Sequence, residues 1–210
     1  TLKDLGFKEV FIPEINKEEA ALIEGIDIFP AKNLLEVINH LKEDVNFSIA
    51  PQELTEILSG PPKAHNDFSD IRGQDVAKRG LEIAAAGGHN IAMYGPPGTG
   101  KTMLARAFSG ILPPLSKEDI LEITGIHSVA GTLDGALITH PPFRCPHNTS
   151  SYVSVIGGGT FPKPGEVTLA HKGVLFLDEF PEFDRRVIES LRQPLEDRVV
   201  HISRSKGTAV

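Results

Sequence analysis

Residues 95–102 read Gly95-Pro96-Pro97-Gly98-Thr99-Gly100-Lys101-Thr102 and fit the phosphate-loop pattern G-x-x-x-x-G-K-[ST] at every fixed position. In such a loop, successive backbone N–H groups wrap the phosphates of a nucleoside triphosphate, and glycines supply conformations that a side chain would forbid. Lys101 is expected to place its charge between the β- and γ-phosphates, and the Thr102 hydroxyl to bind Mg²⁺. The stretch therefore predicts a site for ATP and magnesium.

The sequence on either side of this loop agrees with that interpretation. Residues 90–94 read as a short buried strand, and residues 103–112 read as a helix with apolar residues along one face. This order places the free N–H groups of a helix N-terminus under the phosphates. A glycine-rich turn that matches by chance is the alternative, and the order of strand, loop and helix argues against it.

A second motif, Gly173 to Glu179, is an apolar run that ends in two carboxylates. Such a run suits a central strand of a parallel sheet, and its acids then emerge at the carboxyl edge, where open α/β sheets bind ligands. Asp178 is predicted to hold Mg²⁺ together with Thr102, and Glu179 to polarise the water that attacks the γ-phosphate. The alternative is a polar strand end, which is less favoured beside a complete phosphate loop.

The composition restricts the class of protein. The chain has 210 residues, 40% hydrophobic and 23% charged, enough for one sizeable core or one core plus part of another. No run of about 18 apolar residues and no signal peptide is present, so we expect neither a membrane partner nor secretion. Because Cys145 is the single cysteine, a disulfide scaffold is excluded and a cytoplasmic location is favoured. Cys145 itself is interpreted as a small apolar filler. Because the chain begins at Thr1, we expect a piece of a longer protein.

Charge divides the chain into two parts. Residues 1–62 hold 5 basic and 12 acidic residues, whereas residues 63–210 hold 16 of each, and the change coincides with the linker-like Gly60-Pro61-Pro62. The predicted organisation is a βαβα module over residues 1–45, a linker with a short helix over 46–68 and a second module over 69–210. The acidic total argues against non-specific nucleic-acid binding by the whole chain.

The connection over residues 113–172 is unusually long for a link between two strands of one sheet. We expect it to form an insertion with its own structure, in part a β-hairpin. Its four histidines do not have the spacing of a metal site, so zinc is disfavoured. Beyond the acids, Asp184 is predicted to cap a helix that runs to Gln193 and ends at Pro194.

Several further motifs resemble the magnesium-chelatase-like AAA+ ATPases, and among these the ComM-type proteins. They read Phe143-Arg144-Cys145-Pro146-His147-Asn148-Thr149, Ile156-Gly157-Gly158-Gly159, Pro164-Gly165-Glu166, Leu169-Ala170-His171 and Leu191-Arg192-Gln193-Pro194-Leu195-Glu196-Asp197. The resemblance runs from about residue 69 to the end. It implies an α/β fold: a partial AAA+ P-loop NTPase core with a parallel sheet and a β-hairpin insertion in its second helix. Residues 1–45 are similar to the end of a Lon-protease-like domain, without its catalytic residues.

The resemblance also implies a function. Members of this family are ATPases that act as hexameric rings, and the ComM-type proteins are DNA helicases that drive branch migration of single-stranded DNA in natural transformation. Lys101 and Glu179 would be catalytic, Ile71 and Gly73 would lie near the base, and residues 198–204 would form an arm of the hairpin before the sensor-1 strand. The arginine finger, both sensors and the lid would follow residue 210, so we expect this piece to hydrolyse ATP weakly or not at all.

Two other functions remain open at this point. One is a chelatase-type motor that remodels a protein partner, against which the Lon-like segment argues. The other is a nucleotide-gated scaffold without catalysis, against which the lysine and both acids argue. Cys145 and Asn148 depart from the family pattern, which more often has serine or alanine and a second histidine at these positions.

Overall fold

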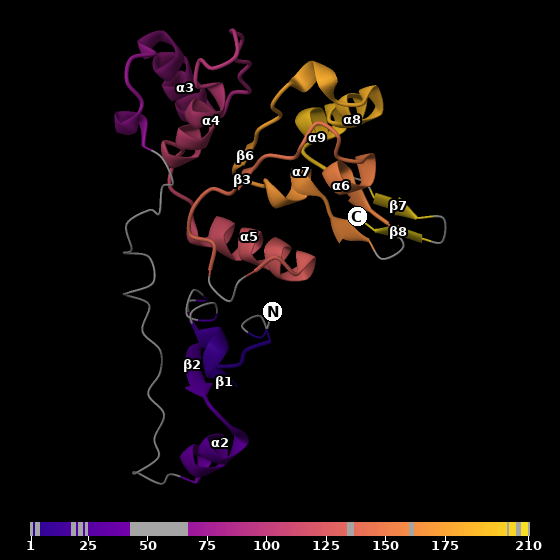
Figure 1. Cartoon of the computed structure of the whole chain (residues 1–210). Helices are drawn as coiled ribbons and strands as arrows, with labels where there is room; N and C mark the ends of the chain where they lie inside the picture. The colour runs from indigo at the N-terminus through magenta and orange to yellow at the C-terminus, as the bar shows by residue number, and fades with distance from the viewer. Residues whose placement is uncertain are drawn as a thin grey trace. The chain divides into compact units, whose positions relative to one another are not determined.

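The computed structural model describes residues 2, 5–17, 20, 23, 25–42, 67–133, 137–159 and 162–200, and the backbone of 202–204 and 207–209. Its contacts divide the chain into two compact units, residues 1–61 with 133–137 and residues 62–132 with 138–210, and we describe each by itself (Figure 1). The predicted short helix within the linker lies outside the described residues.

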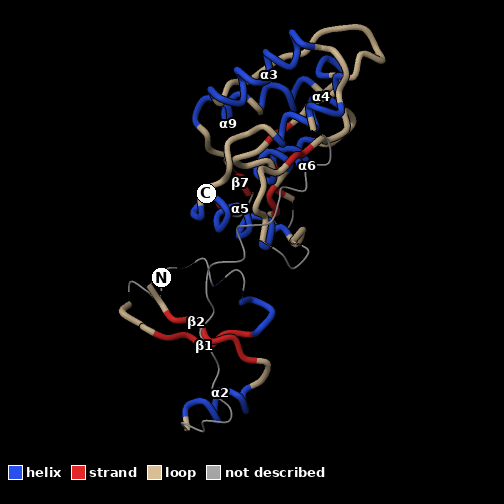
Figure 2. The backbone as a smooth tube through the Cα atoms, turned by 90° about the vertical axis from the view of Figure 1, so that its left-hand side faces the viewer, coloured by secondary structure: helices blue, strands red, loops and turns tan. Residues whose placement is uncertain are grey.

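The first unit contains two parallel strands followed by a helix. Strand β1 (Glu9–Pro13) pairs with β2 (Asp27–Ala31), and the two lie side by side in Figure 2, with the short 3-10 helix η1 (Glu14–Asn16) after β1. Asn33 begins helix α2 (Leu34–Leu41) as its N-cap, because its side-chain oxygen accepts the Glu36 N–H at 3.1 Å. The structure thus contains both strands and the second helix of the βαβα module predicted over residues 1–45.

The second unit contains most of the helices. In chain order its elements are η3 (Phe68–Asp70), α3 (Asp75–Gly87), α4 (Lys101–Gly110), α5 (Lys117–Ala130), β3 (Phe143–Arg144), α6 (Tyr152–Ile156), β4 (Gly157–Gly158), β5 (Lys163–Pro164), α7 (Glu166–Leu169), β6 (Val174–Leu175), η4 (Phe180–Glu182), α8 (Arg185–Ser190), α9 (Arg192–Asp197), β7 (Ile202–Arg204) and β8 (Gly207–Ala209). None of the helices in the described part of the chain combines the length and the apolar character needed to cross a membrane.

The strand pairing supports the predicted α/β class. Strand β3 pairs in parallel with β6, although the two segments lie far apart in the sequence (Figure 1). Between the short helices α6 and α7, strands β4 and β5 pair antiparallel as a hairpin, as predicted for part of the 113–172 segment. A second antiparallel pair, β7 with β8, contains residues of the predicted 198–204 arm.

Three predictions from the sequence are wrong in detail. Residues 90–94, predicted as a short buried strand, join no strand ladder among the described residues, and Tyr94 is fully exposed. A strand forms only where a neighbouring strand pairs with its N–H and C=O groups. The strand over 173–179 is confined to β6 because its partner β3 is equally short. The helix predicted from Asp184 to Gln193 is interrupted at Leu191, and α9 then continues past Pro194. Pro194 is the third residue of α9, so its missing N–H removes no hydrogen bond within that helix.

Two apolar clusters hold the unit together. Ile71, Leu81, Leu104 and Ala107 join α3 to α4, and this pairing supports the phosphate loop between them. A second cluster joins α6 to α8 and consists of Val155, Ile156, Phe183, Val187 and Leu191. Burying such side chains contributes about 1.5–3 kcal/mol each.

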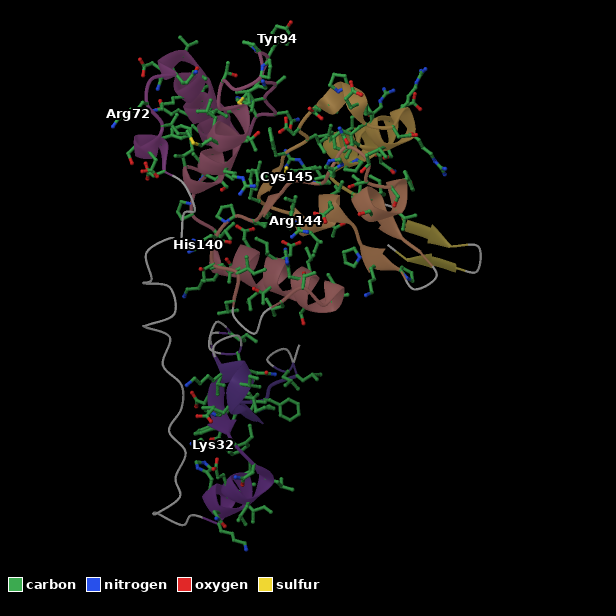
Figure 3. The ribbon with its side chains drawn as sticks, viewed as in Figure 1. Lys32, Arg72, Tyr94, His140, Arg144 and Cys145 are labelled. Carbon is green, nitrogen blue, oxygen red and sulfur yellow. The ribbon has the colours of Figure 1, made fainter. Side chains whose placement is uncertain are left out.

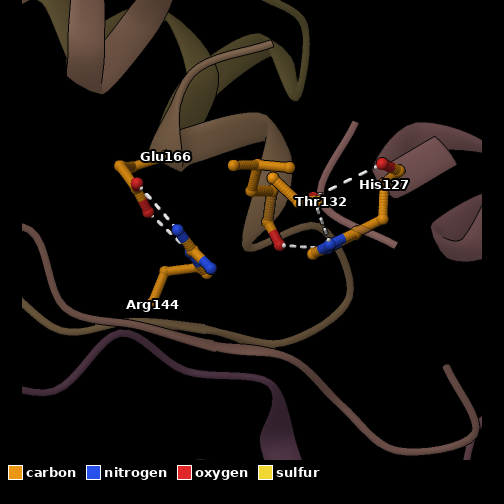
Figure 4. Close-up of polar contacts among 5 residues, drawn as sticks. His127, Thr132, Arg144 and Glu166 are labelled. Atoms are coloured by element: carbon orange, nitrogen blue, oxygen red, sulfur yellow. Dashed lines mark hydrogen bonds and ion pairs between the residues drawn. The ribbon is translucent and has the colours of Figure 1, made fainter. Parts of the chain in front are cut away.

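The buried histidine of helix α5 is part of this framework. His127 is 6% exposed, and its Nε2 lies 3.1 Å from the Leu169 carbonyl oxygen (Figure 4). Its Nδ1 lies 3.1 Å from the Thr132 hydroxyl. Since a carbonyl can only accept, Nε2 donates and Nδ1 is free to accept. Both ring nitrogens are satisfied, so His127 joins α5 to α7 as a structural residue.

Candidate nucleotide site

The predicted phosphate loop forms a turn that ends at the first residue of α4. Gly98 and Gly100 have φ of +81° and +84°, a region that favours glycine. Helix α4 begins at Lys101, so its unpaired first N–H groups face the concave side of the turn. Together with the helix dipole, these groups form an arrangement that binds anions.

The Lys101 ammonium folds back over this loop. Its Nζ donates to the carbonyl oxygens of Gly95 and Pro96, each at 2.9 Å. The Thr99 hydroxyl also donates to Pro96, at 3.0 Å. These bonds hold the turn closed on itself and keep a positive charge beside the N–H groups that would receive a phosphate.

The loop and the acidic pair meet. The Thr102 hydroxyl donates to Asp178 Oδ2 at 2.9 Å. Asp178 follows strand β6, and its other oxygen accepts the N–H of Glu179 at 3.0 Å. The two sequence motifs thus converge on one place at the end of a parallel strand, the kind of edge at which α/β proteins bind ligands.

This pair of side chains fits a magnesium ion. A hydroxyl and a carboxylate are oxygen donors of the kind that Mg²⁺ prefers, and Mg²⁺ is usually held by one or two protein oxygens together with substrate phosphates. In the structure the hydroxyl hydrogen bonds to the carboxylate, so both oxygens already face the same point. Thr102 and Asp178 are therefore the residues that would hold the ion.

Glu179 is held by a residue that sequence reasoning did not place here. The Asn148 amide donates to Glu179 Oε2 at 2.9 Å. Glu179 itself has φ of +54°, uncommon for a residue other than glycine, and such strain is found often at functional sites. The sequence marked Asn148 as a departure from the family pattern, but nothing in its spacing indicated a partner across the fold.

The segment predicted to lie near the base contacts the loop. Ile71 is buried against α3 and α4, and its carbonyl oxygen accepts a hydrogen bond from Lys78 Nζ. Gly73 has φ of +66°, which turns the chain before α3. The next residue, Gln74, donates from its side chain to the Thr99 carbonyl at 3.4 Å. Ile71 and Gly73 therefore belong to a segment that touches the phosphate loop, and contact with a base remains a prediction.

Cys145 does not fill a core. The residue is exposed, and Figure 3 places it beside Arg144 in the middle of the second unit, whereas Tyr94 points away from it. Partial burial of the thiol and the nearby Asp178 carboxylate raise the pKa of Cys145. Because the side chain is exposed, the interpretation of Cys145 as a small apolar filler is wrong.

Two hollows lie on either side of Tyr152, and neither is lined by a predicted site residue. One, of about 440 Å³, is bordered by Thr149–Val153 and by Asp184, Arg186 and Val187. The other, of about 220 Å³, lies against α8 and α9. The Arg186 guanidinium stacks 4.9 Å from the centre of the Tyr152 ring. The phosphate loop itself is an open turn, which suits the binding of phosphates by backbone groups.

Comparison with known proteins extends the argument. Residues 67–210 match the family described as magnesium chelatase, subunit ChlI. The chain is 53% identical over 205 residues to the protein YifB of Salmonella typhimurium, covering 95% of this chain and 39% of that protein. It is 43% identical over 202 residues to the competence protein ComM of Haemophilus influenzae, covering 95% of this chain and 40% of that protein. The chain thus spans about two fifths of the length of these relatives.

A solved structure is more distantly similar. The NtrX protein of Brucella abortus in complex with ADP is 21% identical, with a TM-score of 0.45, over 96% of this chain and 40% of that one.

Proposed function

Because this chain belongs to the magnesium chelatase ChlI family, we propose that it forms the nucleotide-binding part of an ATP-hydrolysing motor. The observation that carries the proposal is the hydrogen bond between Thr102 of the phosphate loop and Asp178 at the end of β6. A phosphate loop can bind nucleotide by itself, and a metal-binding carboxylate beside it adds the means to neutralise charge in phosphoryl transfer.

Binding is proposed to begin with the loop residues Gly95 to Thr102. Their backbone N–H groups receive the phosphates, and the Lys101 ammonium moves from its carbonyl partners to the β- and γ-phosphate oxygens. Thr102 and Asp178 hold Mg²⁺, which when bound neutralises charge on these oxygens. Ile71 and Gly73 form part of the surface beside the base.

Hydrolysis then requires a water molecule in line with the γ-phosphate. The Glu179 carboxylate is proposed to orient this water and to accept its proton as the new P–O bond forms and the bond to the leaving ADP oxygen breaks. Asn148 holds one oxygen of Glu179, which leaves the other available to the water. Lys101 and Glu179 are therefore the proposed catalytic residues.

The finer proposal concerns the partner of the motor. The 43% identity to a protein named for competence supports a role with DNA, and single-stranded DNA is the proposed substrate. We propose that the complete protein acts in the cytoplasm as a hexameric ring, in which a neighbouring subunit supplies an arginine to each site. Such a ring would act as a DNA helicase and would drive branch migration during natural transformation.

The test is an ATPase assay on the complete natural protein, with and without single-stranded DNA. Wild type should hydrolyse ATP with Mg²⁺, single-stranded DNA should stimulate the rate, and Glu179→Gln should abolish turnover while ATP still binds. Absence of any ATPase activity would contradict the motor, and activity that DNA leaves unchanged would contradict the helicase. In that second case, the chelatase-type motor that remodels a protein partner, which the sequence left open, becomes the better interpretation.

A further inference from the structure

Arg144 and Glu166 form a forked ion pair close to the candidate site. Arg144 Nε and Nη2 donate to the two oxygens of Glu166 at 2.6 and 2.8 Å (Figure 4). Their side chains are 32% and 20% exposed, so water screens this pair less than it screens the exposed pairs of α8 and α9. Two parallel charge-assisted bonds fix both the separation and the orientation of the two groups.

The backbone of Arg144 leads to both acids. Its carbonyl oxygen accepts the N–H of Phe176 at 2.8 Å, and Phe176 stands two residues before Asp178. In the other direction along the chain, Asn148 lies four residues beyond Arg144 and holds Glu179. Arg144 thus lies between two features of the site: its backbone pairs with the segment before Asp178, and the chain beyond it leads to Asn148, the partner of Glu179.

Glu166 belongs to the base of the β4–β5 hairpin. It is the first residue of α7 and is separated from β5 by Gly165 alone. A Cβ on Gly165 would lie 2.4 Å from the backbone nitrogen of Gly157 and 2.5 Å from the Val155 carbonyl oxygen, so the backbone packs directly against the end of α6 and the start of β4. Glu166 is thus fixed to the hairpin insertion.

We propose that Arg144 and Glu166 are positioning residues, which fix Asn148, and through it the Glu179 carboxylate, relative to the base of the hairpin insertion. The inference rests on the proposed ATPase activity, since its effect is read as a change in turnover. A pair that merely stabilised the fold would change the melting temperature and would act on turnover independently of Asn148.

A double-mutant cycle separates these roles. Glu166→Gln keeps the shape of the side chain but removes its charge. In the complete protein this substitution should lower kcat about fivefold, while the KM for ATP should change less than about twofold. In an Asn148→Ala background the same substitution should change kcat less than about twofold, because the link it acts through is already gone. Glu196→Gln, in the exposed Arg192–Glu196 pair of α9, is the matched control and should leave kcat unchanged.

The outcomes are distinguishable. If Glu166→Gln lowers kcat by the same factor with and without Asn148, the pair does not act through Asn148 and the inference is wrong. If Glu166→Gln fails to fold, the reversed pair, Arg144→Glu with Glu166→Arg, replaces it. If the reversed pair folds, its kcat should lie within about threefold of the wild-type value. A folded reversed pair with a lower kcat also overturns the inference. A wild type without ATPase activity removes the proposed function itself.

Discussion

The Thr102 hydroxyl donates a hydrogen bond to Asp178 across 2.9 Å, although the two residues stand 76 positions apart in the sequence. One belongs to the first turn of α4 and the other follows β6, so neither element by itself forms the site. The contact thus joins a residue of the phosphate loop to the acid that follows β6, and these are the two residues that would hold the magnesium ion.

This contact leads to a prediction about magnesium. Thr102→Val keeps the shape of the side chain but removes the hydroxyl, and a hydrogen bond to a charged group contributes about 1.5–3 kcal/mol. We expect the Mg²⁺ concentration for half-maximal ATPase activity to rise about tenfold or more, since about 1.4 kcal/mol corresponds to a factor of ten. A magnesium titration of the ATPase rate measures this. An unchanged titration midpoint would remove Thr102 from the metal site.

Lys101 is predicted to be required for nucleotide affinity. Replacement by alanine removes the ammonium, and we expect the Kd for ATP to rise about 10- to 100-fold from the loss of a charged hydrogen bond to phosphate. Titration with a fluorescent ATP analogue measures this, and Arg192→Ala removes a comparable exposed charge on α9 as the control. Equal affinity in Lys101→Ala and wild type would mean that nucleotide binds elsewhere.

Glu179 is predicted to act on turnover rather than on binding. Glu179→Gln should lower kcat about 10²- to 10⁴-fold, the usual contribution of a general base, with the Kd for ATP nearly unchanged. Single-turnover hydrolysis and equilibrium binding on the same preparations separate these two quantities. A variant that retains wild-type turnover would show that another group orients the water.

Asn148 is predicted to orient that carboxylate. Removal of its amide in Asn148→Ala should lower kcat about tenfold, because Glu179 then loses the one side-chain partner recorded for it among the described residues. The KM for ATP should change little, since no hydrogen bond joins the Asn148 side chain to the loop among the described residues. An equal loss in affinity and turnover would indicate a disturbed loop instead of a misplaced carboxylate.

Helix α5 offers a prediction about pH. Hydrogen bonds from Lys172 and then from Ser116 hold the pKa of Asp119 below its ordinary value of 3.8. A carboxylate whose pKa is lower in the folded state stabilises the fold above its unfolded value, and this stabilisation is lost as the pH falls through the folded value. We therefore expect the free energy of unfolding to fall with acid below about pH 4, less steeply in Asp119→Asn.

Acid titration of the melting temperature checks this expectation. Glu118→Gln, one residue earlier on α5, is the matched control and should keep the wild-type acid dependence. If Asp119→Asn and wild type lose stability over the same range with the same slope, the contacts of Asp119 with Lys172 and Ser116 do not persist in solution.

Local signals in the sequence predicted much of the fold. Asp184 begins a helix as expected, because its side chain accepts the Arg186 N–H within the same short segment. The phosphate loop could be predicted equally well, since its glycines and the start of α4 lie within a few residues of one another. Where the predictions were wrong, at residues 90–94 and at the length of β6, the outcome depended on a partner strand elsewhere in the chain.

The sequence by itself determined which groups are available: a glycine-rich turn, a lysine, a hydroxyl and two adjacent acids. Only the tertiary structure decided which further side chains contact these groups. It placed Asn148 on Glu179 and joined Arg144 to Glu166, whereas the two sequence motifs themselves predicted that Thr102 and Asp178 meet. The physical reason is range: caps and turns are set by contacts within a few residues, whereas the parallel pairing of β3 with β6 and the packing of α4 bring together side chains whose separation along the chain gives no signal of their contact.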